Sequence, residues 1–246
     1  LVPEQFTSST EGRIYRELGD ALSGMVESFS FTSLAEKILS TEGGAAVQTL
    51  SDAGRAVLVR RALEELQDNV HYYHRHRRSA AFCQMAAQTI DELKSAGLSG
   101  QQLAQLAGAC GAESGKLSEL ALIFQGYETL LARSGMDPSD RLELAGARLE
   151  EALARHSLPE FLRDRAVFID EFDTFNAPKK RLLWAMLAAL PSVTVALCDD
   201  GAPLLPGDLS LFSGAKQVAA QLRQLARKNG AEVAVPQLLR KDLRHR

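Results

Sequence analysis

The stretch AVFIDEFDTFN, residues 166–176, is the part of this chain that says most about its fold. Apolar residues 166–169 are followed directly by two carboxylates, Asp170 and Glu171, and Pro178 then opens an amphipathic helix. A buried strand of a parallel sheet has this pattern when it brings acids to the carboxyl edge, where open α/β sheets bind ligands. In sheets that hydrolyse nucleotides, the first acid lies near Mg²⁺ and the second orients or deprotonates the attacking water. The alternative is that both acids cap the next helix and solvate a loop.

The flanking pattern predicts an α/β sheet domain that is interrupted by helices. The predicted strands are 26–31, 166–169, 193–197 and 232–235, and the predicted helices outside the interruption are 11–19, 33–39, 178–190 and 214–228. Between Gly43-Gly44 and about residue 160, only helical periodicity is visible. We therefore expect a sheet domain made of residues 1–44 and 159–246, with an inserted all-helical subdomain at residues 45–158.

The composition excludes several classes of protein. With 246 residues and 46% hydrophobic content, the chain can build one large or two modest cores, and it has no apolar run long enough for a membrane span. Cys83, Cys110 and Cys198 form no CxxC motif, so neither a zinc site nor a disulfide framework is indicated, and a reducing cytosol fits. A net charge of −3 means that any DNA contact must come from a local patch. The opening Leu1-Val2-Pro3 is typical of a strand end, so we expect a piece of a longer protein.

One octapeptide, HYYHRHRR at residues 71–78, concentrates basic and aromatic side chains. Arginine neutralises phosphates and aromatic rings stack on bases, so this segment is a candidate contact for DNA. The candidate residues are Tyr72, Tyr73, Arg75, Arg77 and Arg78. The plainer interpretation is a solvated helix end, where Arg and His are favourable. The histidines could suggest a metal, but no acid or cysteine lies at matching spacing.

Several segments resemble the motifs of superfamily I (UvrD-like) DNA helicases, in the order that those helicases use. The matching segments are 169–176 (motif II), 2–7 (the start of motif Ia), 28–39 (the second DNA-contacting segment) and 137–145 (the return from the inserted helical subdomain 1B). Within this group, residues 2–7, 50–55 and 193–198 look most like the AddB-type subunits of bacterial AddAB helicase–nucleases. The resemblance runs through nearly the whole chain.

The resemblance implies a RecA-like (P-loop NTPase-type) parallel sheet domain, which lacks its first strand and phosphate loop here and carries a helical 1B-like insertion. It implies that Asp170 binds Mg²⁺ in the full-length protein, with Glu171 next to it and ATP as the nucleotide. The implied DNA contacts in two loops at the carboxyl edge of the sheet are Phe6, Thr7, Phe31, Thr32 and Ser33. Hydroxyls and a helix N-terminus suit a phosphodiester backbone, although Thr32 or Ser33 can equally be a plain helix cap.

The resemblance also implies partners and a cellular setting. AddB-type subunits pair with an AddA-type helicase–nuclease subunit that supplies the motor, and the heterodimer processes double-strand breaks for recombination in the bacterial cytoplasm. The nuclease of AddB-type subunits and their cysteine-ligated iron–sulfur cluster lie towards the far C-terminus, so we expect no cofactor in this chain. No membrane partner is implied.

Two departures from the helicase pattern bear on catalysis. The phosphate-binding string G-x-x-x-x-G-K-[ST] does not occur in the chain, and no Gln follows the acidic turn at 198–201, where motif III normally has one. We therefore expect this fragment to be catalytically inactive. Two other interpretations stay open: a truncated ATPase domain of an active superfamily I helicase, which Asp170 and Glu171 favour, or a protein-interaction scaffold with vestigial motifs.

Overall fold

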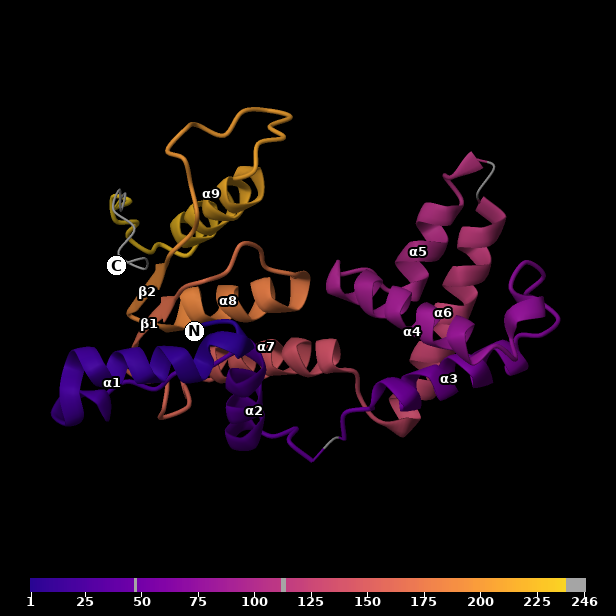
Figure 1. The fold of residues 1–246 in the computed structure, drawn as a ribbon, viewed down its shortest axis with the longest axis horizontal. Helices are drawn as coiled ribbons and strands as arrows, with labels where there is room; N and C mark the ends of the chain where they lie inside the picture. Colours follow the sequence, from indigo (N-terminus) through magenta and orange to yellow (C-terminus); the bar gives the residue numbers. More distant parts are fainter. Residues whose placement is uncertain (47, 112–113, 238–246) are drawn as a thin grey trace. The chain divides into compact units, whose positions relative to one another are not determined.

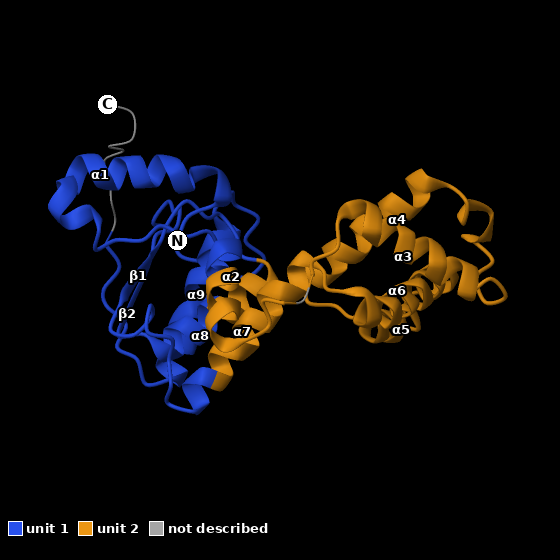
Figure 2. Ribbon diagram, turned by 90° about the horizontal axis from the view of Figure 1, so that it is seen from below, with its two compact units in different colours: residues 1–34, 152–175, 183–246 blue, residues 35–151, 176–182 orange. Residues whose placement is uncertain are grey.

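The computed structural model describes residues 1–46, 48–111 and 114–237. The chain divides into two compact units, coloured separately in Figure 2. Unit 1 contains residues 1–34, 152–175 and 183–246, and unit 2 contains residues 35–151 and 176–182. Because each unit draws on distant parts of the sequence, neither one is a continuous stretch of chain.

Helices are the main regular structure of both units. The elements, labelled in Figure 1, are η1 (Glu4–Phe6), α1 (Thr7–Ser23), α2 (Phe31–Glu42), α3 (Asp52–Glu65), η2 (His74–His76), α4 (Ala80–Ser95), α5 (Gly100–Ala107), α6 (Ser114–Ser134), α7 (Pro138–Ala154), β1 (Ala166–Ile169), α8 (Ala177–Ala189), β2 (Ser192–Val195) and α9 (Ser213–Lys228). Within residues 45–158, the part that the structure describes contains helices and no strand.

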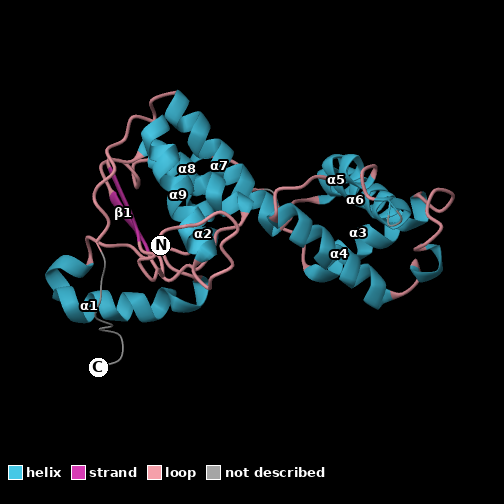
Figure 3. Cartoon of the chain, turned by 90° about the horizontal axis from the view of Figure 1, so that it is seen from above, coloured by secondary structure: helices cyan, strands magenta, loops and turns pink. Residues whose placement is uncertain are grey.

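The two strands of unit 1 form a parallel pair, drawn in magenta in Figure 3. Ala166 lies opposite Ser192, and the register continues to Ile169 opposite Val195. The predicted strand at 166–169 is confirmed residue for residue. Helix α8 connects the strands, which completes the predicted βαβ unit, because a parallel pair needs such a crossover.

Backbone hydrogen bonds extend this layer beyond β1. The carbonyl of Leu1 accepts a bond from the amide of Asp170 at 3.0 Å, and the amino nitrogen of Leu1 donates to the carbonyl of Phe168. This is the pattern of a parallel ladder. On the other side of Leu1, the amide of Val2 donates to the carbonyl of Phe29 at 3.0 Å. Residues 1–2 therefore lie between Phe29 and β1.

Two predicted strands are wrong. Residues 26–30 have no strand structure, because Ser30 and Ser33 cap a helix that begins at Phe31. The amide of Ser30 donates to Oγ of Ser33 at 2.8 Å, and the amide of Ser33 donates back to Oγ of Ser30 at 3.0 Å. Residues 232–235 form no regular structure, and Val235 is 87% exposed. At residues 26–31 the alternation of apolar and polar residues gave a misleading signal for a strand.

Unit 2 contains a hydrophobic cluster built by α3, α4, α5 and α6. Its largest fully buried side chains are Leu63, Ile90, Ile123, Phe124 and Tyr127. The helix α3 begins as the sequence indicates, because Oγ of Ser51 accepts a bond from the amide of Gly54 at 3.2 Å. This cluster gives residues 58–131 a core of their own.

The chain enters and leaves this helical cluster through two segments that pair with each other. The amide of Leu50 donates to the carbonyl of Met136 at 2.9 Å, and the amide of Met136 donates to the carbonyl of Gln48 at 3.0 Å. Gly135 makes the close approach possible: its φ is 152°, and a Cβ atom there would lie 2.7 Å from the carbonyl oxygen of Gln48.

A buried polar network fixes the exit segment. Nζ of Lys94 lies 2.8 Å from Oδ2 of Asp137 and 2.7 Å from Oδ2 of Asp140. The hydroxyl of Tyr127 donates to Oδ1 of Asp137 at 2.6 Å, and the Asp137 side chain is 1% exposed. The predicted return segment 137–145 is therefore attached to α4 and α6 by charged hydrogen bonds.

Candidate nucleic-acid interface

Asp170 and Glu171 lie at the carboxyl end of β1, as predicted, and both are half-buried. The amide of Glu171 donates to Oδ1 of Asp170 at 2.8 Å. Glu171 itself has a φ of 66°, the left-handed region that a residue with a side chain seldom adopts. Both acids line a cavity of about 740 Å³, whose wall also includes Arg13 and Arg165. A strained acid next to a cavity is a typical feature of a functional site.

Two loop starts lie near these acids. Residues 1–2 run parallel to β1, so Pro3 and the following residues leave from the same edge as Asp170. The start of α2 reaches that edge as well, because the ring of Phe31 packs against Phe172, two residues after Asp170. The structure thus brings the predicted loop at 31–33 next to the acids.

Phe31 is a core residue in this structure. Its ring centroid is 5.2 Å from that of Phe172 and 5.9 Å from that of Phe175, with edge-to-face geometry, and the residue is 2% exposed. A ring buried among aromatic neighbours has no free face on which a base can stack. Its role here is to attach α2 to the loop that carries the acids.

The other predicted residues of these loops differ in how accessible they are. Phe6 is 39% exposed, and Thr32 and Ser33 are exposed at the first turn of α2. Ser33 takes part in the helix cap described above, and Oγ1 of Thr7 donates to the carbonyl of Glu4 at 3.1 Å. The hydroxyl of Ser33 is engaged within the cap, where it also donates to the carbonyl of Ser30 at 3.2 Å, whereas Phe6 and Thr32 stay exposed to a ligand.

Asp170 is the residue that the sequence assigns to Mg²⁺, with Glu171 next to it. Over the described ranges 1–46, 48–111 and 114–237, no group of three His, Cys, Asp or Glu side chains is arranged to hold a metal ion. One oxygen of Asp170 already accepts the amide of Glu171, and the chain has no glycine-rich loop whose amides could surround phosphates.

The basic octapeptide at 71–78 forms an ordered turn followed by η2. Two rings of the octapeptide stack on Phe82 of α4: the centroids of Tyr73 and His76 are each 5.5 Å from that of Phe82, at an interplanar angle of 29°. Nη1 of Arg77 contacts Nε2 of His74. These contacts fix the inner side of the segment.

The outer side of the octapeptide faces solvent. Tyr72 is 58% exposed, and Arg75 and Arg78 are also exposed, whereas Tyr73 and Arg77 are half-buried. The structure therefore divides the five predicted residues into three that can reach a ligand and two that support the turn. Cationic and aromatic groups on one exposed turn suit a phosphodiester chain with unpaired bases.

Sequence reasoning missed two residues that shape this turn, Phe82 and Glu119. Glu119 is buried on α6, where the side chains at 123 and 127 share its face of the helix. A carboxylate on an otherwise apolar face needs a partner, and that was the signal available in the sequence. Phe82 carried no comparable signal, because an apolar residue in the first turn of a helix is ordinary.

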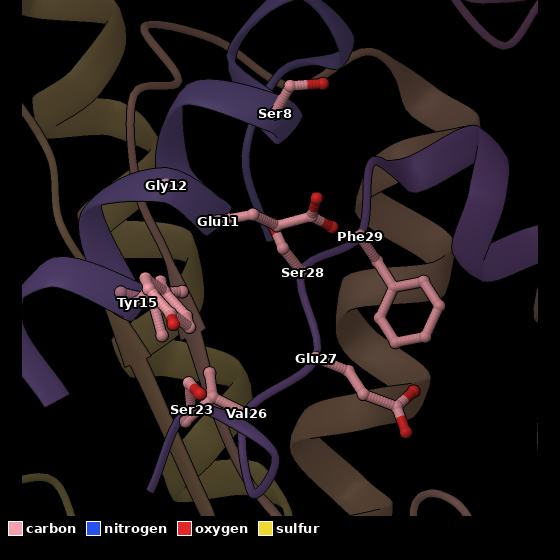
Figure 4. A pocket seen from close by; sticks show the side chains of 10 residues that line it. Ser8, Glu11, Gly12, Tyr15, Ser23, Val26, Glu27, Ser28 and Phe29 are labelled. Carbon is pink, nitrogen blue, oxygen red and sulfur yellow. The ribbon is translucent and has the colours of Figure 1, made fainter. Parts of the chain in front are cut away.

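A second cavity, of about 700 Å³, opens next to α1 and is lined by Glu11, Tyr15, Glu27 and Phe29 among others (Figure 4). Two carboxylates in its wall repel phosphate groups. None of the described helices is both long and apolar enough to cross a bilayer.

Comparisons with known proteins agree closely with one another. The family described as "ADDB, N-terminal" matches residues 1–246. The protein named as the B subunit of an ATP-dependent helicase/deoxyribonuclease in Desulforudis audaxviator is 34% identical over 244 residues, which are 96% of this chain and 20% of that protein. Proteins of the same name from Moorella thermoacetica and Heliobacterium modesticaldum are 32% and 31% identical, over 95% and 94% of this chain and 20% and 19% of their own lengths. The chain spans about a fifth of the length of these relatives.

Proposed function

The chain belongs to the family of AddB N-terminal domains, and from that premise we propose that it is the helicase-like region of the B-type subunit of an ATP-dependent helicase/deoxyribonuclease. Its role is to bind DNA during double-strand break repair and recombination, next to an AddA-type subunit in the bacterial cytoplasm. The DNA-binding part of the proposal rests on the turn at 71–78. This turn exposes Tyr72, Arg75 and Arg78, while Tyr73 of the same turn stacks on Phe82.

The fold that accompanies this proposal is a RecA-like sheet domain without its first strand and phosphate loop. The parallel pair β1–β2, with residues 1–2 hydrogen-bonded to β1, supports it. The helical cluster of unit 2 supports an insertion at about residues 45–158. The acids after β1 then lie at the ligand-binding edge of the sheet, and the exposed Phe6 and Thr32, together with the capping residue Ser33, form a second DNA contact there.

Removing the arginines of the turn is expected to weaken DNA binding in a salt-dependent way. In the Arg75→Ala/Arg77→Ala/Arg78→Ala variant, the slope of log affinity against log salt should become shallower by up to about one and a half to two units, because the exposed Arg75 and Arg78 can each contact a phosphate and each lost contact is worth about 0.7–0.9. Fluorescence titration of a single-stranded oligonucleotide at several salt concentrations measures this slope.

A matched control removes three other arginines of unit 2. Arg60, Arg61 and Arg148 pair with Glu64, Glu65 and Glu151 at 3.0, 3.0 and 2.8 Å, so a neighbouring carboxylate already offsets each charge. Replacing these three with Ala should leave the slope within about one unit of that of the original protein. Equal slopes in both triple variants would contradict a specific role of the turn.

The chain is not expected to hydrolyse ATP, because Asp170 and Glu171 have no phosphate-binding loop to work with. Calorimetric titration with Mg·ATP should give no binding in the micromolar range, and a phosphate-release assay with single-stranded DNA should give no turnover. Turnover that disappears in Asp170→Ala would contradict this and would favour the alternative, an ATPase domain of an active superfamily I helicase. The variant Asp170→Asn removes the negative charge but keeps the size of the side chain, so its comparison with Asp170→Ala separates the loss of charge from the loss of volume.

A further inference from the structure

We propose that Glu119 is a positioning residue for DNA binding: its carboxylate holds the backbone of the turn at 71–78 in the conformation that presents Tyr72, Arg75 and Arg78. The inference rests on the proposed function, since it concerns the same surface. Glu119 lies on α6, more than forty positions further along the chain, and has no need to touch DNA itself.

The first support is the hydrogen bonding of the carboxylate. Oε1 accepts the amides of His71 at 2.7 Å and Tyr72 at 3.0 Å, and Oε2 accepts the amides of Tyr72 at 2.8 Å and Tyr73 at 3.2 Å. Consecutive backbone amides that converge on one anion form the arrangement that binds anions in proteins. Here the internal carboxylate of Glu119 fills that position and accepts the amides of three consecutive residues of the turn.

The second support is burial. Glu119 is 6% exposed, and Val70, directly before the turn, is 1% exposed. Burying a carboxylate is unfavourable unless hydrogen bonds compensate it, so the amides and the carboxylate depend on each other.

Four residues before Glu119 on the same helix, Gly115 supports the ring of Tyr72: a Cβ atom at 115 would lie 3.0 Å from that ring. Helix α6 therefore fixes both the backbone of the turn and its exposed aromatic side chain.

Charge and position predict opposite effects for Glu119→Gln, which makes the proposal testable. The change removes a negative charge near three arginines, so electrostatics alone would tighten DNA binding. The change also places an NH₂ group opposite backbone N–H donors. An NH₂ group cannot accept the hydrogen bonds of these donors. If Glu119 positions the turn, the variant binds DNA more weakly in spite of the more positive surface.

The control is Glu128→Gln, which makes the same chemical change on the same helix. The carboxylate of Glu128 accepts the amide of Gly100 at 3.3 Å, away from the turn. We expect Glu119→Gln to lose about fivefold or more in affinity for a single-stranded oligonucleotide and to shallow the salt slope by about one to two units. Glu128→Gln should keep or slightly increase both. The amides of residues 71–73 should exchange with deuterium faster in Glu119→Gln and at an unchanged rate in Glu128→Gln.

Glu119→Asp provides a second variant should the Gln protein not fold. It keeps the charge and shortens the side chain by one methylene, so it loses the reach to three amides and should also weaken DNA binding. Affinity unchanged or raised in both Glu119 variants, with the arginine variant impaired, would overturn the role of Glu119 and leave the proposed function intact. Unimpaired binding in the arginine variant would overturn the DNA-binding turn itself, and the inference with it.

Discussion

Asp137→Ala is expected to lower the free energy of unfolding by about 3 kcal/mol. The carboxylate is 1% exposed and accepts bonds from Lys94 and Tyr127, at 2.8 and 2.6 Å. Without it, the hydroxyl of Tyr127 is left buried without this partner. The effect should stay at the lower end of the range for broken buried pairs, because Lys94 keeps its contact with Asp140 at 2.7 Å. Urea denaturation followed by far-UV circular dichroism measures the change.

Glu64→Ala is the matched control for this loss. It breaks the contact with Arg60 at 3.0 Å, where both side chains are more than half exposed. An exposed pair of this kind contributes about 0–1 kcal/mol. Similar losses in Asp137→Ala and Glu64→Ala would mean that the network around Asp137 does not stabilise the exit from the helical cluster.

The same network should make the protein sensitive to alkali. Burial opposes the charge on Lys94, but hydrogen bonds to Asp137 and Asp140 outweigh it and raise the pKa of Lys94. Burial and the bond to Asp137 raise the pKa of Tyr127. A group whose pKa is raised on folding stabilises the folded protein fully at pH values below the pKa of the unfolded state. This contribution is lost as the pH rises through the pKa of the folded state. Stability should therefore fall above about pH 10, and less steeply in Tyr127→Phe.

Phe31→Ala is expected to destabilise the protein by about 3–5 kcal/mol, the cost of removing a buried phenylalanine. The ring is 2% exposed and contacts Phe172 and Phe175 edge to face. Trp184, the only tryptophan, lies in unit 1 and reports its unfolding by fluorescence. Phe6→Ala, at a position 39% exposed, should cost about 1 kcal/mol or less.

These two variants also separate a core role from a DNA contact. Under conditions where both proteins stay folded, Phe31→Ala should keep its DNA affinity within about twofold, whereas Phe6→Ala should lose more, because an exposed ring can stack on a base. A Phe31→Ala protein of nearly original stability and strongly reduced affinity would restore Phe31 to the DNA-contacting residues.

Local patterns predicted the elements around the acids well, because short-range signals decide them. The run at 166–169 became β1, and the helices expected at 178–190 and 214–228 begin within one residue of α8 and α9. The aromatic alternation at 26–31 failed, because a cap formed by Ser30 and Ser33 started a helix there. Capping depends on a pair of side chains, which the alternation of apolar residues does not reveal.

The candidate site could be predicted only in part, because some of its residues contact residues that lie far away in the sequence. The basic turn was visible as a cluster of residue types, but the reason that Tyr73 and Arg77 are half-buried lies in Phe82 and in the fold of the turn. Glu119 is separated from the amides it binds by 46–48 positions. One sequence contains nothing that pairs such positions, since the pairing arises from how α3 and α6 pack.

The most direct test of the DNA-binding turn is amide hydrogen exchange of this chain with and without a saturating single-stranded oligonucleotide. DNA bound through the turn should slow the exchange of amides within residues 74–78, and raising the salt concentration should remove this protection as affinity falls. Protection confined to other segments while the oligonucleotide is bound, or unchanged exchange at 74–78 at low salt, would contradict the account.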